Sequence, residues 1–293
     1  MRILVTGASG MFGEDIAEVL EEKGHDVIRF KGRSHVDLCD AAVAIPAIRE
    51  ARPQAIVHAA AWRDIDRCET EPVSAFENNA LGTRNVMLAA TGMDCKVVHI
   101  STDAVFDGEK GTPYHEFDSP NPINVYGLTK LAAENEVRSF VRRHFIVRVP
   151  LLLGLGGPPG ANLIVKTVEK ARKGEEIVAA CDQVASPTYT RHAAQIVERL
   201  LGTDLYGTYH VCNAGSGSRW DVAVEILRLA GYPTARVRPV ASAELRRPGP
   251  RQRYVVMTSI CLKAVAEQCL PDWRAALSEC MKVMAERRPE LFS

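Results

Sequence analysis

The sequence predicts an α/β protein whose core is a doubly wound parallel sheet. Short apolar runs alternate with longer segments of helical periodicity along the first half of the chain. The first of these runs leads directly into a glycine-rich turn, and a helix-like segment follows. At 293 residues the chain is long enough for more than one domain. We expect residues 1–155 to form the larger domain, with some later segments returning to it, and residues 156–293 mainly a smaller α/β domain.

The composition argues against several classes of partner. Lys plus Arg equals Asp plus Glu at 36 each, so no overall charge attracts the chain to nucleic acid or to an anionic membrane. No apolar run approaches the length of a membrane span, and the first residues lack the apolar stretch of a signal peptide. The eight cysteines include no Cys-x-x-Cys pair, which favours buried free thiols over disulfides or zinc. We therefore expect a cytoplasmic protein with no membrane segment, no nucleic-acid partner and no metal site.

Apolar runs mark the expected strands of the first half, because a strand covered on both faces is apolar throughout. Segments with apolar residues at helical spacing separate them, and Gly24 stands where the first helix is expected to end. Pro46 costs its helix a hydrogen bond, so we place it in a first turn or at a kink. The expected strands are 2–6, 26–30, 55–61 and 96–100, and the expected helices are 14–23, 41–52 and 72–91. In the second half we expect helices at 162–173, 190–201, 219–230 and 273–287, and strands near 176–179 and 209–212.

Gly7, Gly10 and Gly13 lie between a predicted strand and a predicted helix. In this context the glycines indicate a dinucleotide-binding Rossmann sheet. Gly7 permits the tight turn, Gly10 lets the backbone approach a pyrophosphate, and Gly13 lets helix and strand pack closely. The helix N-terminus supplies free N–H groups and a positive dipole end for the phosphates. The alternative is a tight strand-to-helix turn without a ligand.

Basic residues follow the second predicted strand. An acid at this strand end suits the free ribose hydroxyl of NAD, whereas a base suits the ribose phosphate of NADP. Lys31 and Arg33 stand here, and no acid occurs before Asp37. We therefore expect NADP(H) to be preferred, with NAD(H) possible; a solvated basic loop is the alternative.

Tyr126 and Lys130 are four residues apart, on one face of a predicted helix. A phenol has a pKa of about 10, and a nearby ammonium lowers it, so the pair suits proton transfer in carbonyl chemistry. The pair alone also fits an ordinary amphipathic helix. Upstream, Ser101 and Thr102 follow the fourth predicted strand, at the edge of the sheet where ligands of open α/β folds bind. His99 lies within the apolar run and is interpreted as a core histidine.

Together these motifs resemble the extended short-chain dehydrogenase/reductases. Within that superfamily the resemblance narrows to the dTDP-4-dehydrorhamnose reductase group, and the matches follow the family's order over most of the chain. The matching segments are residues 58–69, 101–108, 120–130 with Glu134, 182–188 and 207–211.

The resemblance implies an NADPH-dependent reduction of a 4-keto-6-deoxy sugar that is attached to a nucleotide diphosphate. It implies that Thr102 polarises the keto oxygen, that Tyr126 donates the proton, and that Lys130 lowers the tyrosine pKa and binds the nicotinamide ribose. Further residues are implied to line the cofactor or the substrate. These are Gly10, Met11 and Phe12 at the pyrophosphate, Asp37 and Leu38 at the adenine, Ala60, Ala61, Trp62 and Arg63 along the cofactor, and Asp103 and Asn162 at the substrate.

The chain departs from the family on the substrate side. Ala104 replaces the usual tyrosine, Leu151 stands where a tryptophan is usual, and Arg63 replaces a common threonine. We expect Ala104 and Leu151 to line a reshaped sugar pocket beside intact hydride-transfer residues. Ala104 also argues against a dehydratase, which carries an acid there. Two alternatives stay open: a nucleotide-sugar epimerase that retains its dinucleotide, and a non-catalytic NADP-binding subunit such as the β subunit of methionine adenosyltransferase. A homodimer is possible.

Two later loops are candidates for substrate contacts. The Gly- and Pro-rich segment 154–160 is either a mobile lid over the substrate or a plain linker. Four arginines cluster near the C-terminal third, and one or two of them suit a substrate pyrophosphate. They are Arg246, Arg247, Arg251 and Arg253.

Overall fold

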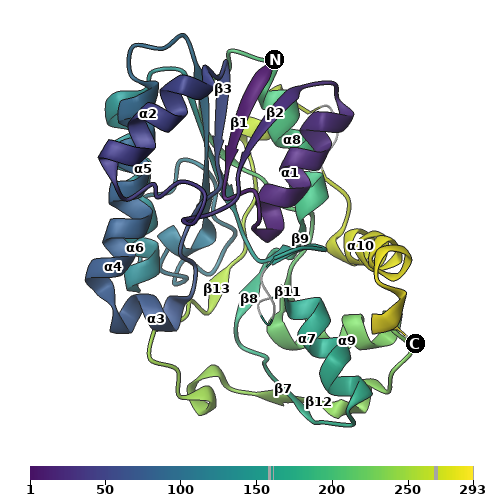
Figure 1. Ribbon diagram of the computed structural model, residues 1–293. Coiled ribbons are helices and arrows are strands. Elements are labelled where there is room, and N and C mark those ends of the chain that lie inside the picture. Colours follow the sequence, from purple (N-terminus) through teal and green to yellow (C-terminus); the bar gives the residue numbers. More distant parts are fainter. Residues whose placement is uncertain (158–159, 161, 267–269, 293) are drawn as a thin grey trace.

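A six-stranded sheet forms the centre of the computed structural model, which describes residues 1–157, 160, 162–266 and 270–292 (Figure 1). The strand order is β10-β5-β4-β3-β1-β2, and each pairing between these neighbours is parallel. The order reverses between β1 and β3, which makes their carboxyl ends the expected ligand site. The strands are β1 (Arg2–Thr6), β2 (Asp26–Phe30), β3 (Ala55–His58), β4 (Lys96–Thr102), β5 (His144–Val149) and β10 (Gly207–His210).

Helices cover both faces of this sheet and enclose two apolar cores. One core joins the sheet to α1 and α8, and the other joins it to α2, α5 and α6 (Figure 1). The doubly wound parallel sheet predicted from the sequence is therefore confirmed. These helices are α1 (Met11–Glu22), α2 (Ala41–Ala51), α5 (Gly82–Ala90), α6 (Val125–Phe140) and α8 (Thr190–Leu201).

Three local expectations need correction. Strand β3 ends at His58 rather than at residue 61, so the small residues after it are free to line a ligand site. Pro46 lies inside α2 and beyond its first turn. Of the two expected positions, the first turn is therefore wrong, and the kink stays a prediction. The helix expected at 72–91 contains a π-helical turn, η1 (Glu77–Leu81), between α4 (Pro72–Phe76) and α5. A π-helical turn shifts which side chains face inward, and such turns are frequent at functional sites.

The remaining segments form a smaller α/β part on the carboxyl side of the main sheet (Figure 1). Trp273 is fully buried there, as predicted for a core residue, whereas Trp220 is only half-buried. Strand β10 and helix α8 return to the main sheet, and the domain boundary near residue 155 stays a prediction. Helix α3 (Ile65–Thr70) instead packs against α4 and α6 beside the main sheet. The elements of the smaller part include β6 (Leu152–Leu153), α7 (Leu163–Arg172), β7 (Ile177–Ala180), β8 (Val184–Ala185), β9 (Thr188–Tyr189), β11 (Gly217–Ser218), α9 (Arg219–Leu229), β12 (Val237–Val240), β13 (Tyr254–Val255) and α10 (Trp273–Arg287).

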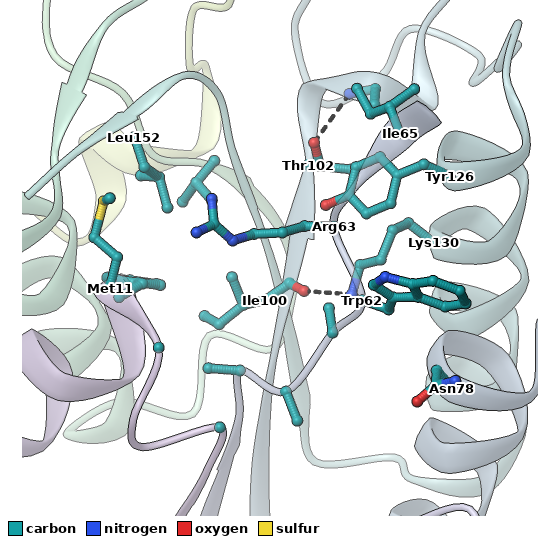
Figure 2. Close-up of a pocket in the computed structure, with 18 of the residues that line it drawn as sticks. Met11, Trp62, Arg63, Ile65, Asn78, Ile100, Thr102, Tyr126, Lys130 and Leu152 are labelled. Carbon is teal, nitrogen blue, oxygen red and sulfur yellow. Dashed lines mark hydrogen bonds between the residues drawn. The ribbon is translucent and has the colours of Figure 1, made fainter. Parts of the chain in front are cut away.

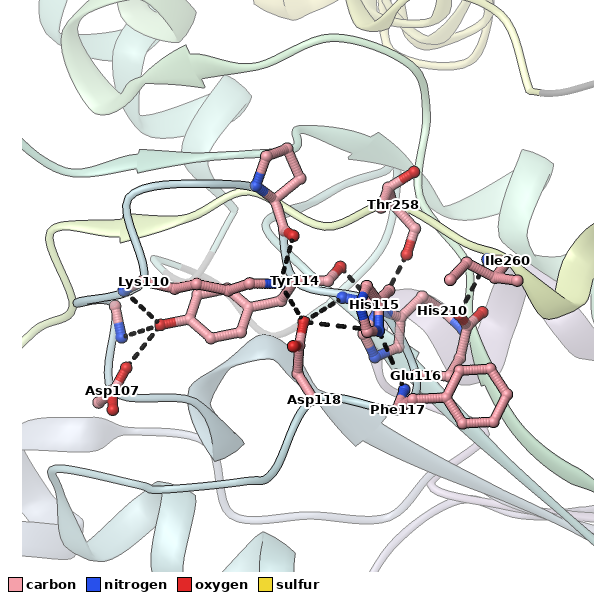
Figure 3. Close-up of polar contacts among 12 residues, drawn as sticks. Asp107, Lys110, Tyr114, His115, Glu116, Phe117, Asp118, His210, Thr258 and Ile260 are labelled. Carbon is pink, nitrogen blue, oxygen red and sulfur yellow. Dashed lines mark hydrogen bonds and ion pairs between the residues drawn. The ribbon is translucent and has the colours of Figure 1, made fainter.

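The loop after β4 joins the C-terminal segment to the sheet edge (Figure 3). The Glu116 carboxylate accepts hydrogen bonds from the backbone N–H groups of His210 (3.0 Å) and Ile260 (2.9 Å). The imidazole of His210 in turn contacts the carbonyl oxygens of Tyr114 (3.2 Å) and Thr258 (3.1 Å) through Nδ1. Segments that are far apart in the sequence are thus fixed around the carboxyl ends of β4 and β5.

A buried ion pair holds α6 against the sheet. Arg148 on β5 donates to both carboxylate oxygens of Glu134 on α6, at 2.9 and 2.8 Å, and Ser101 on β4 donates to one of them at 2.6 Å. Both charged side chains are almost fully buried. Burial alone would raise the pKa of Glu134, but the hydrogen bonds and charge of Arg148 hold this pKa below its usual value. Helix α6, which carries Tyr126 and Lys130, is therefore held in place by the Glu134 carboxylate, whose burial requires a charged partner.

Replacing Arg148 with methionine should destabilise the protein by about 3–5 kcal/mol, because it leaves the Glu134 carboxylate buried without its main partner. Urea unfolding of the parent and the variant measures this difference. Arg84→Met is the matched control, since Arg84 pairs with Glu136 on the same helix at the surface. An exposed pair contributes at most about 1 kcal/mol. Equal losses in the two variants would contradict the assignment.

Candidate active site

A cleft of about 910 Å³ lies along the carboxyl ends of the main strands (Figure 2). It includes the switch point between β1 and β3, where ligands of open α/β sheets bind. All of the site residues predicted from the sequence line this cleft except Asn162. They are Gly7, Gly10, Met11, Phe12, Gly13, Lys31, Arg33, Asp37, Leu38, Ala60, Ala61, Trp62, Arg63, Thr102, Asp103, Ala104, Tyr126, Lys130 and Leu151.

The glycine turn leaves a cradle that no side chain fills. Gly7 has a φ of +67°, and a Cβ there would lie 2.7 Å from Cα of Ala60. A Cβ on Gly13 would lie 2.1 Å from the carbonyl oxygen of Gly7, so the close packing of helix and strand requires glycine. Gly10 is the N-cap of α1, and the first N–H groups of the helix face the cleft behind it. This geometry fits the pyrophosphate of a dinucleotide at a helix N-terminus.

The basic residues after β2 line the far end of the same cleft. Arg33 is largely exposed, but its Nε lies 3.1 Å from Oδ2 of Asp37. The guanidinium also lies 3.1 Å from Sγ of Cys39. No acid occurs between β2 and Asp37 in the sequence, but the turn after β2 brings Asp37 itself into contact with Arg33. Lys31 has no ion pair among the described residues.

Two hydroxyl groups meet where β4 ends and α6 begins (Figure 2). Tyr126 lies in the first turn of α6, whose N-cap Asn124 accepts a hydrogen bond from the Gly127 N–H at 2.8 Å. Thr102 is the last residue of β4, and its hydroxyl lies near enough to that of Tyr126 to act on the tyrosine pKa. The Thr102 hydroxyl also donates to Oδ1 of Asp103 at 2.9 Å. Thr102, Tyr126 and Lys130 thus line one cleft, as the sequence predicts.

The protonation of this group differs from the expectation. Burial raises the pKa of Tyr126 to about 12, against the opposing effect of the nearby Thr102 hydroxyl. The Lys130 ammonium donates to the carbonyl oxygen of Ile100 at 2.8 Å and lies 3.2 Å from Nε2 of His99. Burial lowers the pKa of Lys130 to about 8. The expectation that Lys130 lowers the tyrosine pKa is therefore wrong for the ligand-free protein, in which burial outweighs it.

Asn79 holds the loop after β3 against α6. Its amide oxygen accepts from the backbone N–H of Trp62 at 2.7 Å, and its amide nitrogen donates to the Trp62 carbonyl at 2.9 Å. The same nitrogen donates to Thr129 at 2.9 Å, and the Thr129 hydroxyl donates to the carbonyl of Tyr126 at 2.7 Å. The sequence placed Asn79 inside a helix without assigning it a role. This role depends on Trp62 and Thr129, which lie far from Asn79 in the sequence, so only the fold reveals it.

The substrate side of the cleft carries several charges. Burial raises the pKa of Asp103 to about 6, and the hydrogen bond from Thr102 opposes this shift. Arg63 points into the cleft and has no hydrogen bond or ion pair within the described part of the chain (Figure 2). Arg219, at the start of α9, and Gln252 also line the cleft. Both were missed, because nothing in the sequence distinguishes them from other polar residues of that region.

The four clustered arginines separate into two groups. Arg247 and Arg251 line the cleft, whereas Arg246 and Arg253 do not. Arg251 binds the Asp66 carboxylate through two nitrogens, at 2.8 and 3.0 Å.

Asn162 has a different place from the one implied by the resemblance. It is buried and caps α7, accepting from the Ile164 N–H at 3.0 Å and donating to the Gly154 carbonyl at 2.7 Å. The amide oxygen and the amide nitrogen of Asn162 thus both bind backbone groups. Asn162 therefore fixes the loop before α7 instead of making the expected substrate contact. Parts of the expected lid 154–160 lie outside the described residues.

Two other kinds of feature are absent from the described ranges. No group of three or more His, Cys, Asp or Glu side chains is arranged to hold a metal ion. No helix there is long and apolar enough to cross a membrane. Among the described residues, Cys181 is an exposed free thiol, contrary to the expectation of burial.

Comparison with known proteins agrees with this geometry. The sequence profile of the family described as "RmlD substrate binding domain" matches residues 1–286. The chain is 38% identical to a dTDP-4-dehydrorhamnose reductase of Streptomyces griseus, over 98% of this chain and 95% of that protein. It is 33% identical to a probable dTDP-4,6-dihydroxy-2-methyloxan-3-one 4-ketoreductase of Streptomyces antibioticus, over 99% of this chain and 98% of that protein. A crystal structure of dTDP-4-dehydrorhamnose reductase from Bacillus anthracis in complex with NADP has a TM-score of 0.91 and 33% identity, covering 96% of this chain and 99% of that one.

Fold and site together define an NAD(P)-dependent oxidoreductase of the extended short-chain dehydrogenase/reductase class. Within this class, the chain belongs to the RmlD substrate binding domain family, the family of the dTDP-4-dehydrorhamnose reductases.

Gly13→Ala should abolish measurable NADPH binding, because the added Cβ would overlap the Gly7 carbonyl and force helix and turn apart. Calorimetric titration with NADPH measures the loss. Gly82→Ala is the matched control, since a Cβ there meets its nearest atoms at 3.7 Å in an ordinary helical position. Alanine in a helix is favoured over glycine by about 0.5–1 kcal/mol, so this variant should bind NADPH normally. Normal binding by Gly13→Ala would contradict the role of the turn.

Proposed function

We propose that the protein uses NADPH to reduce the 4-keto group of a nucleotide-diphosphate-linked 6-deoxy sugar, a reaction of deoxysugar synthesis such as that of dTDP-rhamnose. The observation that carries this proposal is the meeting of Thr102, Tyr126 and Lys130 in the cleft that the glycine turn opens. The names of the relatives support the same reaction. NADPH and nucleotide sugars are cytoplasmic metabolites, so we place the protein there; a homodimer stays a prediction.

The reaction needs a hydride at the carbonyl carbon and a proton at the carbonyl oxygen. The bound nicotinamide would supply the hydride. Tyr126 is the proton donor, and its raised pKa keeps the hydroxyl protonated at neutral pH until the substrate arrives. Thr102 is the second hydroxyl at the keto oxygen. The phenolate that remains after proton transfer is stabilised by positive charge, and Arg63 already acts on Tyr126 in this direction.

Positive charge on the substrate side of the cleft suits the phosphates of a nucleotide diphosphate. Arg219 and Arg247 line the cleft, and guanidinium groups bind phosphate oxygens through paired hydrogen bonds. Asp103 would contact a sugar hydroxyl. Ala104 and Leu151 are smaller than the tyrosine and tryptophan usual in the family, so they leave room for a sugar with a bulkier substituent.

Tyr126→Phe should lower kcat by about a hundredfold or more, the scale for loss of a general acid, and should leave NADPH affinity nearly intact. Oxidation of NADPH followed by absorbance measures kcat, and calorimetry measures the affinity. Tyr232→Phe, at a tyrosine that packs in the smaller part and does not line the cleft, is the control. Turnover of Tyr126→Phe within a few-fold of the parent would rule out this role.

Arg33→Ala should weaken NADPH binding by about tenfold or more, the effect of losing a charge-assisted hydrogen bond, and should leave NADH binding unchanged. Calorimetric titration of both cofactors gives the ratio. Arg29→Ala is the control, because Arg29 on β2, the strand before the turn that holds Arg33, pairs with Glu21 outside the cleft. Equal affinity for both cofactors in parent and variant would show that Arg33 does not read the phosphate.

The reaction itself is tested with a panel of nucleotide-linked 4-keto-6-deoxy sugars, including dTDP-4-keto-rhamnose. NADPH oxidation with one of them identifies the substrate. Stoichiometric dinucleotide in the purified protein, with no need for added cofactor, would favour an epimerase. No oxidation with any sugar, together with a co-purifying protein partner, would favour a non-catalytic subunit.

A further inference from the structure

His99 is a buried neighbour of Lys130 to which the proposed reaction assigns no role. It lies on β4 and is fully buried, and its Nε2 is 3.2 Å from Nζ of Lys130. The sequence interpretation of His99 as a core residue is correct for its burial but leaves out this contact. The lysine is fixed at a second point, since its Nζ donates to the carbonyl of Ile100 at 2.8 Å.

The two ring nitrogens of His99 have different surroundings. An ammonium can only donate, so Nε2 of the imidazole accepts and the ring proton is assigned to Nδ1. Within the described residues Nδ1 has no hydrogen-bond partner. Among the described residues the ring therefore has no acceptor to which it could pass a proton from Lys130. A buried N–H without an acceptor costs stability, and such a group is retained where it serves a function.

The charges around the pair keep the imidazole neutral. Burial holds the pKa of His99 well below its usual value, and the positive charge of Lys130 adds to this, with smaller contributions from His58, Arg138 and His144. On the lysine, burial lowers the pKa, whereas Glu134 on the same helix raises it. A neutral His99 can accept a hydrogen bond from the ammonium throughout the working pH range.

We propose that His99 is a positioning residue for Lys130. Its Nε2 and the Ile100 carbonyl occupy two of the three N–H donors of the ammonium, so the third points into the cleft that Lys130 lines. This third donor is the one available to a ribose hydroxyl. The inference rests on the proposed function insofar as it takes the ligand of the cleft to be NADP(H).

The chain contains a matched control for this role. His58 on β3 is directly paired with His99 in the sheet register, is equally buried, and has its ring centroid 5.4 Å away. Its nitrogens contact the hydroxyl groups of Thr6 at 2.7 Å and Thr83 at 3.0 Å instead of the lysine. A purely structural requirement for a buried imidazole would apply to both residues, whereas positioning of Lys130 applies only to His99.

The test is the pH dependence of NADPH affinity, which needs no sugar substrate. In the parent, affinity should fall as pH rises through the Lys130 pKa of about 8, because the deprotonated amine loses its charge. His99→Leu removes an acceptor from the ammonium, so the midpoint should fall by about one pH unit, the scale of one hydrogen bond to a charged group. His99→Gln restores an acceptor oxygen and should return the midpoint toward that of the parent. His58→Leu should leave the midpoint unchanged.

Two results would overturn the inference while the parent binds NADPH. The first is that His99→Leu leaves the pH midpoint of NADPH affinity unchanged. The second is that His58→Leu lowers this midpoint as much as His99→Leu does, while His99→Gln fails to return it toward the parent value. If His99→Leu does not fold, His99→Asn replaces it, because its shorter amide does not reach Nζ. Equal midpoints in the Asn and Gln variants would then also overturn it. A parent that does not bind NADPH at any pH would instead overturn the proposed function, and this inference with it.

Discussion

The docking of α6 on β4 is the interaction on which the rest of the site depends. Tyr126, Lys130 and Glu134 follow one another at four-residue spacing, so they share one face of the helix. They contact Thr102, the Ile100 carbonyl and Ser101 of β4. A rotation or a shift of this helix would move all three contacts together. The buried pair of Glu134 with Arg148 prevents that movement, because separating the two charges would leave the buried Arg148 guanidinium without its carboxylate partner.

Burial also sets the chemistry of the site before any ligand binds. It keeps Tyr126 protonated and makes Lys130 a weaker base than a lysine in water. Both effects come from removing water, which disfavours the charged form of each group. The phenol of Tyr126 therefore stays protonated until the reaction. A nearby positive charge stabilises the phenolate only after the proton has been transferred. Lys130 in the ligand-free protein is directed instead by His99 and the Ile100 carbonyl.

The two ends of the cleft are built with different rigidity. The cofactor end is a backbone cradle in which Gly7 and Gly13 cannot be replaced, because an added Cβ would overlap main-chain atoms. The substrate end is formed by side chains from separate segments, such as Arg63 after β3 and Arg219 on α9. A side chain can change there without moving the backbone. This difference would allow side chains such as Arg63, Ala104 and Leu151 to vary within the family while the cofactor end stays fixed.

The sequence by itself determined the sheet, the glycine turn and which residues are candidates for the reaction, because strand and helix periodicity and motif spacing are local properties of the chain. Gly7 and Tyr126 could be placed from their neighbours alone. The tertiary structure decided what depends on contacts between distant segments: the inward turn of Asn79, the return of Asp37 to Arg33, the capping role of Asn162 and the presence of Arg219 in the cleft. It also decided the direction of the Tyr126 pKa shift. The four-residue spacing to Lys130 predicts a lowered value, but the phenol is buried by segments that only the fold brings together, and removal of water outweighs the nearby charge.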